Sequence, residues 1–494
     1  MTVAGRKAKP SLMLDFRPVG YVIGLVVVAL GASMLLPMAL DLAQGNGHWG
    51  IFAESAILTM VCGAVLALAC SNGVQAGLSI QQTFLLTTGV WFVLPMFGCL
   101  PFILGATDAS LADGFFEAMS GLTTTGSTVF SGLDDLPQGI LLWRSMLQWF
   151  GGVGIIVVAM VFLPELRVGG MQIFRSESFD TDGKVLPQAA QIAQRISVVY
   201  VLLTLACFLS YSAVGLSTLD AMHHSLTTIA TGGFSSHDAS FGAFKGTPEY
   251  VAVIFMILAC LPFIRYVQML AGQHSPLFRD TQVRTFLWIL AAIVALMTFR
   301  QVVVLGDGVE PAFREVIFNV TSIMSGTGYA STDYQLWGAF SVAIFFFIGF
   351  IGGCAGSTTC SIKVFRFQLL FTSIRSMIRT IHSPSGVFTP RYEGRPVPEE
   401  VMSSVMAFFG LFVVSVGVLA VLLGMTGLDF VTAVSGAATA MANVGPGLGQ
   451  IIGPAGNFGE LNDTAKWLLS AGMLIGRLEL MSVYAILTLN FWRA

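Results

Sequence analysis

The stretch SGLTTTGSTVFSGL, residues 120–133, decides how the fold is inferred, because it places hydroxyl side chains and glycines between two hydrophobic segments. It contains no charged residue. A single loop of this kind is usually a plain turn, since glycine and short polar residues favour turns. Its meaning therefore depends on the rest of the chain, and first on the composition.

The composition indicates an integral membrane protein. Of the 494 residues, 55% are hydrophobic and only 10% are charged, and the mean hydropathy is +0.80. Soluble domains carry about 25% charged residues, so a soluble protein of this length could not cover its surface with so few. The net charge of −3 is small and no basic patch occurs, so nucleic acid is not an expected partner. The expected environment is the lipid bilayer.

Ten apolar segments approach the roughly 20 residues that a helix needs to cross a bilayer. One of them, 337–351, is short, and it continues through GGCAGSTTCS into 362–374. We therefore expect this span to be broken in the middle. The expected spans are 18–41, 51–71, 82–105, 138–163, 196–216, 250–271, 284–305, 337–351, 400–424 and 465–490.

The distribution of basic residues predicts the orientation of these spans. Lysine and arginine gather in the N-terminal tail and in the loops 164–195, 265–284 and 363–395. The linkers between them are acidic or nearly free of basic residues. Because basic loops stay in the cytoplasm, both termini are expected inside, and the tail is expected to be no cleaved signal peptide.

The pattern of residues 120–133 recurs in all four external linkers. Each linker holds a short, half-polar helical stretch that ends in a glycine-bearing loop: DGFFEAMSGLTTTGST, DAMHHSLTTIATGGFS, REVIFNVTSIMSGTGYAS and VSGAATAMANVGPGLG. Aligning Gly126, Gly232, Gly328 and Gly445 gives intervals of 96 to 117 residues, which is an internal repeat.

The predicted fold is an all-α polytopic membrane protein. Four tandem helix–pore-loop–helix repeats surround a central pore, after an extra N-terminal helix pair. The expected divisions are 1–75 for the tail and extra pair, 76–180, 181–275 and 276–385 for repeats 1 to 3, the third with a broken second helix, and 386–494 for repeat 4.

The repeated loops have the chemistry of a cation filter. A half-helix that enters from outside points its partly negative C-terminal end at the membrane centre, where it favours a cation. Non-helical backbone at that depth is tolerated where it lines a water-filled path, and its carbonyls replace the hydration shell of an ion. Glycine permits the backbone angles required, and threonine adds an uncharged oxygen. Without a carboxylate ring, a monovalent cation is favoured over Ca²⁺ or Mg²⁺.

The motifs TTTGST, TGGFS, SGTGY, GGCAGSTTCSIK and GRLEL resemble those of the Trk/Ktr/HKT superfamily of potassium transporters, most closely the Trk-type pore-forming membrane subunits of bacteria. The resemblance covers essentially the whole chain. It implies potassium, because one glycine per repeat marks potassium selectivity in this family. The fourth loop, NVGPG, departs most from the pattern, so that quarter is expected to bind the ion less symmetrically. The filter residues expected are Thr124, Thr125, Gly126, Thr231, Gly232, Gly233, Thr327, Gly328, Tyr329, Asn443, Val444 and Gly445, with K⁺ at Thr125, Thr231, Thr327 and Val444.

The broken span is the second candidate site. Small and hydroxyl residues fill 351–361, and Gly349 with Gly353 forms a GxxxG pair, which is also typical of close helix packing. The resemblance implies instead an unwound loop that gates the pore below the filter. The residues expected in this gating loop are Gly352, Gly353, Gly356, Ser357, Thr358 and Thr359.

Arg477 is the third candidate, because a charge inside a spanning helix is costly and marks function. The alternative is a snorkelling or salt-bridged arginine, with Glu479 as a possible partner, although residues two apart face different sides of a helix. The resemblance implies a pore arginine that acts as an electrostatic barrier. Arg144, in another span, is expected to be interfacial or paired.

These observations predict potassium uptake across the bacterial inner membrane by a pore-forming subunit. The resemblance further implies a homodimer and a cytosolic TrkA-type subunit that binds NAD or ATP. The alternative is a secondary transporter that carries a small solute through broken helices. No catalytic motif occurs, so an enzyme is not expected, and K⁺ is the only ligand expected on this chain. The sequence does not distinguish a channel from H⁺- or Na⁺-coupled symport.

Overall fold

The computed structural model describes residues 15–73, 78–158, 185–273 and 275–493. Seven helices in this part of the chain are long and apolar enough to cross a membrane, or nine if two bent pairs are each counted as one span. The seven spans are α1–α2 (Arg17–Ser33 and Leu35–Ala43), α3 (Trp49–Cys70), α4–α5 (Ile80–Gly98 and Leu100–Ile103), α7 (Gln138–Val157), α10 (Val185–Ala213, apolar from Gln191), α15 (Thr281–Arg300, with a π-helical end to Leu305) and α19 (Glu399–Met425). They confirm the predicted fold class.

Three spans of the described residues contain a sharp bend or an unwound segment, whereas the sequence predicted one. The predicted break lies between α17 (Ala339–Ile348) and α18 (Val364–His382). A second lies between α12 (Thr247–Ala259) and α13 (Phe263–Leu270), which are bent by 89°. Pro262 prevents α12 from continuing, because proline has no backbone N–H to donate to the helix.

The third break divides the last predicted span, 465–490. Helix α22 (Asp463–Arg477) is bent by 110° from α23 (Leu480–Ile486). Glu479 has a φ of +60°, a left-handed angle that a helix interior does not contain. The chain therefore turns sharply next to Arg477.

Four shorter helices end inside the molecule, one in each repeat, and we call them the pore helices. Side-chain caps mark the starts of three of them: Ser110 and Ser217 each accept a backbone N–H three residues on, and Asp429 accepts two, whereas α16 begins after Gly308 without a side-chain cap. Their last turns are buried. The pore helices are α6 (Leu111–Leu122), α11 (Thr218–Ile229), α16 (Val309–Met324) and α20 (Phe430–Ala442).

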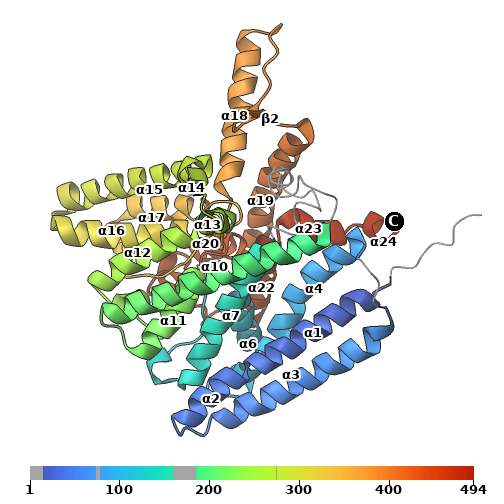
Figure 1. Cartoon of the computed structure of the whole chain (residues 1–494). Helices are drawn as coiled ribbons and strands as arrows, with labels where there is room; N and C mark the ends of the chain where they lie inside the picture. The colour runs from blue at the N-terminus through green and yellow to red at the C-terminus, as the bar shows by residue number, and fades with distance from the viewer. Residues whose placement is uncertain (1–14, 74–77, 159–184, 274, 494) are drawn as a thin grey trace, which may run out of the picture.

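The extra helix pair packs along one side of the first repeat (Figure 1). The end of α2 is fixed there by Asp41, which is fully buried and accepts a hydrogen bond of 2.8 Å from the backbone N–H of Gly139. His48 lies 3.3 Å from the same carboxylate. The pair is therefore joined to α7, which begins beside Gly139.

Helices α18 and α19 form a hairpin that projects beyond the other helices (Figure 1). Two short antiparallel strands, β1 (Arg391–Tyr392) and β2 (Arg395–Pro396), join them. Much of the predicted basic loop 164–195, the N-terminal tail to residue 14, and the division points near 75 and 180 lie outside the described residues. The repeat boundaries remain predictions.

Candidate ion pathway

The four loops that follow the pore helices share one backbone conformation. In each loop two residues have positive φ, separated by one residue that does not. The outer of the two is glycine in every repeat. The pairs are Thr124 and Gly126 (φ 51° and 87°), Thr231 and Gly233 (50° and 80°), Gly326 and Gly328 (73° and 82°), and Asn443 and Gly445 (52° and 70°).

This conformation corrects the predicted alignment of the second repeat by one residue. Gly233, rather than Gly232, has the positive φ that matches Gly126. The residue between the two positive φ angles is therefore Gly232. The sequence analysis had expected Thr231 at this place in the ring. The sequence TGG offers two adjacent glycines, and only the backbone angles distinguish them.

The four loops close into a ring. A Cβ atom added to each outer glycine would meet the carbonyl oxygen of the residue before the glycine in the following repeat. At the first two positions it would overlap that oxygen, and at the other two it would lie 3.0 and 3.1 Å away. The contacts join Gly126 to Gly232, Gly233 to Thr327, Gly328 to Val444 and Gly445 to Thr125. Because the fourth repeat returns to the first, the four carbonyls surround one axis, and only glycine fits beside them.

Hydroxyl groups line the inner end of this ring. The hydroxyl of Thr125 lies 2.7 Å from the hydroxyl of Thr123. In the third loop the hydroxyl of Thr327 lies 2.7 Å from that of Ser325, which is also two residues earlier. The fourth loop differs, because the amide of Asn443 donates to the hydroxyl of Thr125 at 2.9 Å. The fourth loop is thus joined to its neighbour in the ring, the first loop, by a side-chain contact.

Tyr329 lies behind the ring and does not contribute its side chain to the pathway. Its hydroxyl contacts Thr227 and lies 3.2 Å from Thr228, both on α11. Its ring is fully buried beside Phe241. Tyr329 therefore braces the third loop against the second pore helix.

Gln148 on α7 is a contact that the sequence analysis missed. Its amide nitrogen donates to the carbonyl of Gly232 at 2.6 Å, and its amide oxygen accepts from the backbone N–H of Phe234 at 3.0 Å. It lies one helical turn after Arg144. The signal available in the sequence was the presence of two polar residues, Arg144 and Gln148, four positions apart inside an apolar span.

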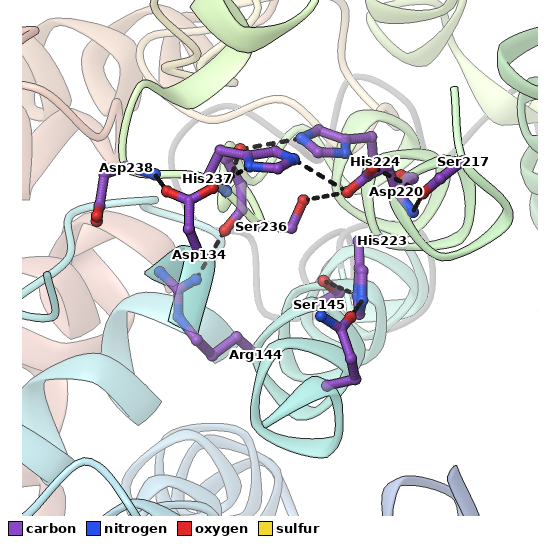
Figure 2. A network of polar contacts seen from close by, with 12 residues as sticks. Asp134, Arg144, Ser145, Ser217, Asp220, His223, His224, Ser236, His237 and Asp238 are labelled. Carbon is purple, nitrogen blue, oxygen red and sulfur yellow. Dashed lines mark hydrogen bonds and ion pairs between the residues drawn. The ribbon is translucent and has the colours of Figure 1, made fainter. Parts of the chain in front are cut away.

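A cavity of about 200 Å³ opens on the outer side of the ring. All four outer glycines line it, together with the chain segments that leave the ring and with Arg144. Figure 2 shows the polar network beside it, in which His237 lies between Asp134 and Asp220 and Arg144 points toward the same segment. Carboxylates at this mouth favour the approach of cations.

Two carboxylates of this network, Asp134 and Asp220, have lowered pKa values, which favours their charged form. A hydrogen bond from His237 lowers the pKa of Asp134 below its ordinary value. Burial alone would raise the pKa of Asp220, but hydrogen bonds from Ser217 and Ser236 leave it lowered.

The predicted gating loop lies directly beneath the ring. Residues 352–361 contain no helix, and the chain enters and leaves at a bridge between Ile351 and Ile362. Ser361 donates twice, from its N–H and its hydroxyl, to the carbonyl of Ala442 at the end of α20, both at 3.0 Å. The thiol of Cys360 lies 3.5 Å from the hydroxyl of Thr124 in the first loop. The helix-packing alternative does not fit, because Gly353 lies in the loop and not in a helix.

Two basic side chains hold this loop. Lys363, which the sequence analysis missed, reaches back to the hydroxyls of Thr359 and Ser357 at 2.8 and 3.5 Å. Arg477 donates to the carbonyl of Thr358 at 3.4 Å and contacts the thiol of Cys360. Lys363 lies two residues after Ser361, where the loop ends. A basic residue directly after this run of small residues was the signal in the sequence.

Arg477 is buried and faces the pathway. It also donates to the carbonyl of Gly151 on α7 at 3.3 Å. Among the ion pairs of the described residues, Glu479 pairs with Arg366, and none includes Arg477. The space between Asn443, the gating loop and the two basic residues is about 40 Å³, room for a few waters at most.

Four pore segments in one ring, with a loop and a fixed charge beneath them, define a polytopic ion-transport protein. A model of the TrkH family, described as cation transport protein, matches residues 50–490. The chain belongs to the TrkH family, as its motifs predicted.

Relatives resemble the chain over nearly their whole length. The Trk system potassium uptake protein TrkI of Halomonas elongata is 42% identical over 481 residues, covering 96% of this chain and 97% of the relative. TrkH of Salmonella typhimurium is 35% identical and covers 97% of this chain and 100% of the relative. The crystal structure of the potassium transporter TrkH from Vibrio parahaemolyticus superposes with a TM-score of 0.89 at 33% identity, over 97% of this chain and 100% of that one.

Proposed function

We propose that this chain takes up potassium across the bacterial inner membrane as the pore-forming subunit of a Trk-type system. The observation that carries the proposal is the closed ring of four carbonyls, one from each repeat. Its relatives in Halomonas elongata and Salmonella typhimurium, which are named as potassium uptake proteins, support it.

The ring is proposed to bind K⁺ through the carbonyls of Thr125, Gly232, Thr327 and Val444. Gly232 replaces Thr231 in this set because of the corrected alignment. Carbonyl and hydroxyl oxygens without a carboxylate suit a weakly hydrated monovalent ion, whose hydration shell they replace. No residue of the ring carries a charge, which disfavours a divalent cation.

The loop 352–361 and Arg477 are proposed to form the gate and the barrier. Contacts of the loop with Thr124 and Ala442 support this, because they put it across the inner exit of the ring. The guanidinium of Arg477, which forms no ion pair among the described residues, adds a fixed positive charge on the proposed path of the cation. Opening then requires that the loop leave Lys363 and Arg477.

The partners are proposed to be a second copy of this chain and a cytosolic TrkA-type subunit that binds NAD or ATP. The projecting α18–α19 hairpin supports a docking role. It exposes the basic Arg375 and Arg379 beside the apolar Met377 and Ile381. Its positive charge supports a cytoplasmic location for the hairpin, and the proposed orientation has both termini on the same side.

The alternative, a secondary transporter for a small organic solute, has less support. Such carriers use two halves of inverted orientation around one site. Here the ring is made of four repeats in the same orientation, and the space at its centre is lined by backbone. The function that we propose is transport and not catalysis of a chemical reaction.

The test is uptake of K⁺ and Rb⁺ by a potassium-uptake-deficient bacterial strain that expresses this chain, with and without a TrkA-type subunit. We expect growth at low potassium and saturable Rb⁺ uptake that Na⁺ competes for weakly. The inactive control is the same strain with the empty vector. Normal membrane expression without Rb⁺ uptake in either background would refute the proposal.

A further inference from the structure

A buried ion pair lies behind the ring and takes no part in the pathway described above. Arg144 on α7 donates to Glu117 on the first pore helix at 2.8 Å. The side chains are 1% and 0% exposed, so both charges are fully removed from solvent. Removing two charges from water is costly, and a buried pair of this kind is by itself weak evidence for stability.

Glu117 holds the segment that leaves the first loop. Its carboxylate accepts the backbone N–H of Val129 at 2.9 Å and the hydroxyl of Thr128 at 3.0 and 3.1 Å. Val129 follows the outer glycine, Gly126, by three residues. Hydrogen bonds to a charged acceptor are short and directional, so they fix this segment closely.

Arg144 extends the same contact to the second repeat. It donates to the carbonyl of Ser235 at 2.8 Å, two residues after Gly233, and to the hydroxyl of Thr128 at 3.2 Å. Its guanidinium lies 4.3 Å above the ring of Phe234. The ion pair therefore connects the outgoing segments of two neighbouring loops. Figure 2 shows Arg144 beside the second of these segments.

In the other repeats no carboxylate occupies the position equivalent to Glu117, although in the second repeat Asp220 also contacts the outgoing segment through Ser236 and His237. Asn319, nine residues before Gly328 as Glu117 is before Gly126, accepts the N–H of Ser331 at 3.2 Å. Ser435 accepts the N–H of Leu448 at 3.0 Å, and His224 contacts the hydroxyl of Ser235 at 3.0 Å. A neutral side chain thus suffices to hold a segment. The carboxylate in the first repeat requires a further explanation, and its partner Arg144 supplies one.

We propose that Glu117 and Arg144 are positioning residues for ion selectivity: they fix the first and second loops relative to each other, so that the carbonyls of Thr125 and Gly232 stay at the spacing that favours K⁺ over Na⁺. The proposal rests on the proposed function of the ring. A binding site has to be held to within roughly 0.5 Å to discriminate. The Glu117–Arg144 pair is buried, whereas the other ion pair that joins the outgoing segments of these two loops, His237 with Asp134, is partly exposed.

The pair also neutralises the outer mouth. Arg144 lines the cavity through which a cation reaches the ring. With Glu117 beside it, the net charge of the pair is zero. Removing Glu117 alone leaves a positive charge at the entrance, which lowers cation entry in addition to releasing Val129.

The decisive variant is the double substitution Glu117→Gln with Arg144→Met. The glutamine oxygen still accepts from Val129, as Asn319 does in the third repeat, and no charge is left buried without a partner. We expect this protein to fold and to transport Rb⁺, with discrimination against Na⁺ lowered roughly tenfold, because the link to Ser235 is lost. Arg144→Lys, which keeps one charge-assisted contact, is expected to retain part of the discrimination.

The matched control is Glu249→Gln with Arg314→Met, a second largely buried ion pair that contacts no residue of the ring. The discrimination of this control variant between Rb⁺ and Na⁺ should equal that of the wild type. Purified proteins in liposomes are compared by Rb⁺ influx with Na⁺ as competitor, and folding is checked by size-exclusion chromatography.

Wild-type discrimination in the Glu117→Gln/Arg144→Met protein would overturn the proposal, and so would an equal loss in the control pair. Gly233→Ala in the same assay separates this from the proposed function. If Gly233→Ala also leaves discrimination unchanged, the ring itself is not the filter. If only Gly233→Ala changes it, the ring stands and the positioning role of the ion pair is refuted.

Discussion

Replacing Gly233 by alanine tests the ring at its tightest contact. Gly233 has a φ of +80°, and a Cβ at this position would overlap the carbonyl oxygen of Thr327. Gly215, before the second pore helix, is a matched control, because its φ is +97° and no atom lies within 4 Å of an added Cβ. The two substitutions share the backbone strain and differ in the collision.

The magnitude follows from these two terms. An alanine held in the left-handed region costs roughly 1–2 kcal/mol, and both variants share this loss of stability. Only Gly233→Ala must also displace the Thr327 carbonyl, by more than the roughly 0.5 Å within which a binding site is held. A relative loss of about 1.4 kcal/mol for K⁺ or Rb⁺ against Na⁺ corresponds to a tenfold loss of discrimination.

The assay is Rb⁺ influx into proteoliposomes with Na⁺ as competitor, together with the unfolding temperature in detergent. We expect the unfolding temperature to fall in both variants, and further in Gly233→Ala because of the collision, with a loss of discrimination between Rb⁺ and Na⁺ only in Gly233→Ala. A folded Gly233→Ala protein with wild-type discrimination would refute the reasoning, as would an equal change in Gly215→Ala.

Three further predictions concern the barrier, the gate and the outer network. Arg477→Ala should raise Rb⁺ flux on the order of tenfold, because it removes a fixed charge near the path of a cation, whereas Arg477→Lys should stay near wild type; unchanged flux in a well-expressed alanine variant would place the arginine off the path. A deletion within Gly353–Thr359 should raise Rb⁺ flux with unchanged Na⁺ competition and with less dependence on a TrkA-type subunit; flux equal to the wild type would make the segment a packing element. Because the pKa of Asp134 is lowered in the folded protein, its stabilising effect is present above the ordinary aspartate value of 3.8 and is lost as the pH falls through the lowered value, so Asp134→Asn should unfold at a lower temperature than wild type at pH 6, and the two should converge in acid. A constant difference across this range would contradict the contact with His237.

The spans and the four loops were predictable because their signals are local. Apolar length marks a spanning helix, and Ser110, Ser217 and Asp429 mark the starts of pore helices. The break at residues 351–361 was predicted from its run of small residues. The break at Pro262 had an equally local signal, a proline inside an apolar run, which the sequence analysis did not use.

Other features depend on contacts distant in sequence, so they were not predictable from it. The turn at Glu479 is stabilised by Arg366, 113 residues earlier. The choice between Gly232 and Gly233 is decided by the neighbouring carbonyl of Thr327, since either glycine allows the turn. Arg144 was expected to be paired or interfacial, but its partner Glu117 lies on another helix, 27 residues away.

The central claim is that four carbonyls from four repeats form one ion-binding ring, and anomalous scattering from crystals of this protein grown with Rb⁺ tests it most directly. The account predicts an anomalous peak on the axis between the carbonyl oxygens of Thr125, Gly232, Thr327 and Val444, reduced by competition with K⁺ and absent in Gly233→Ala. Rubidium bound elsewhere, with none between these four oxygens, would contradict it.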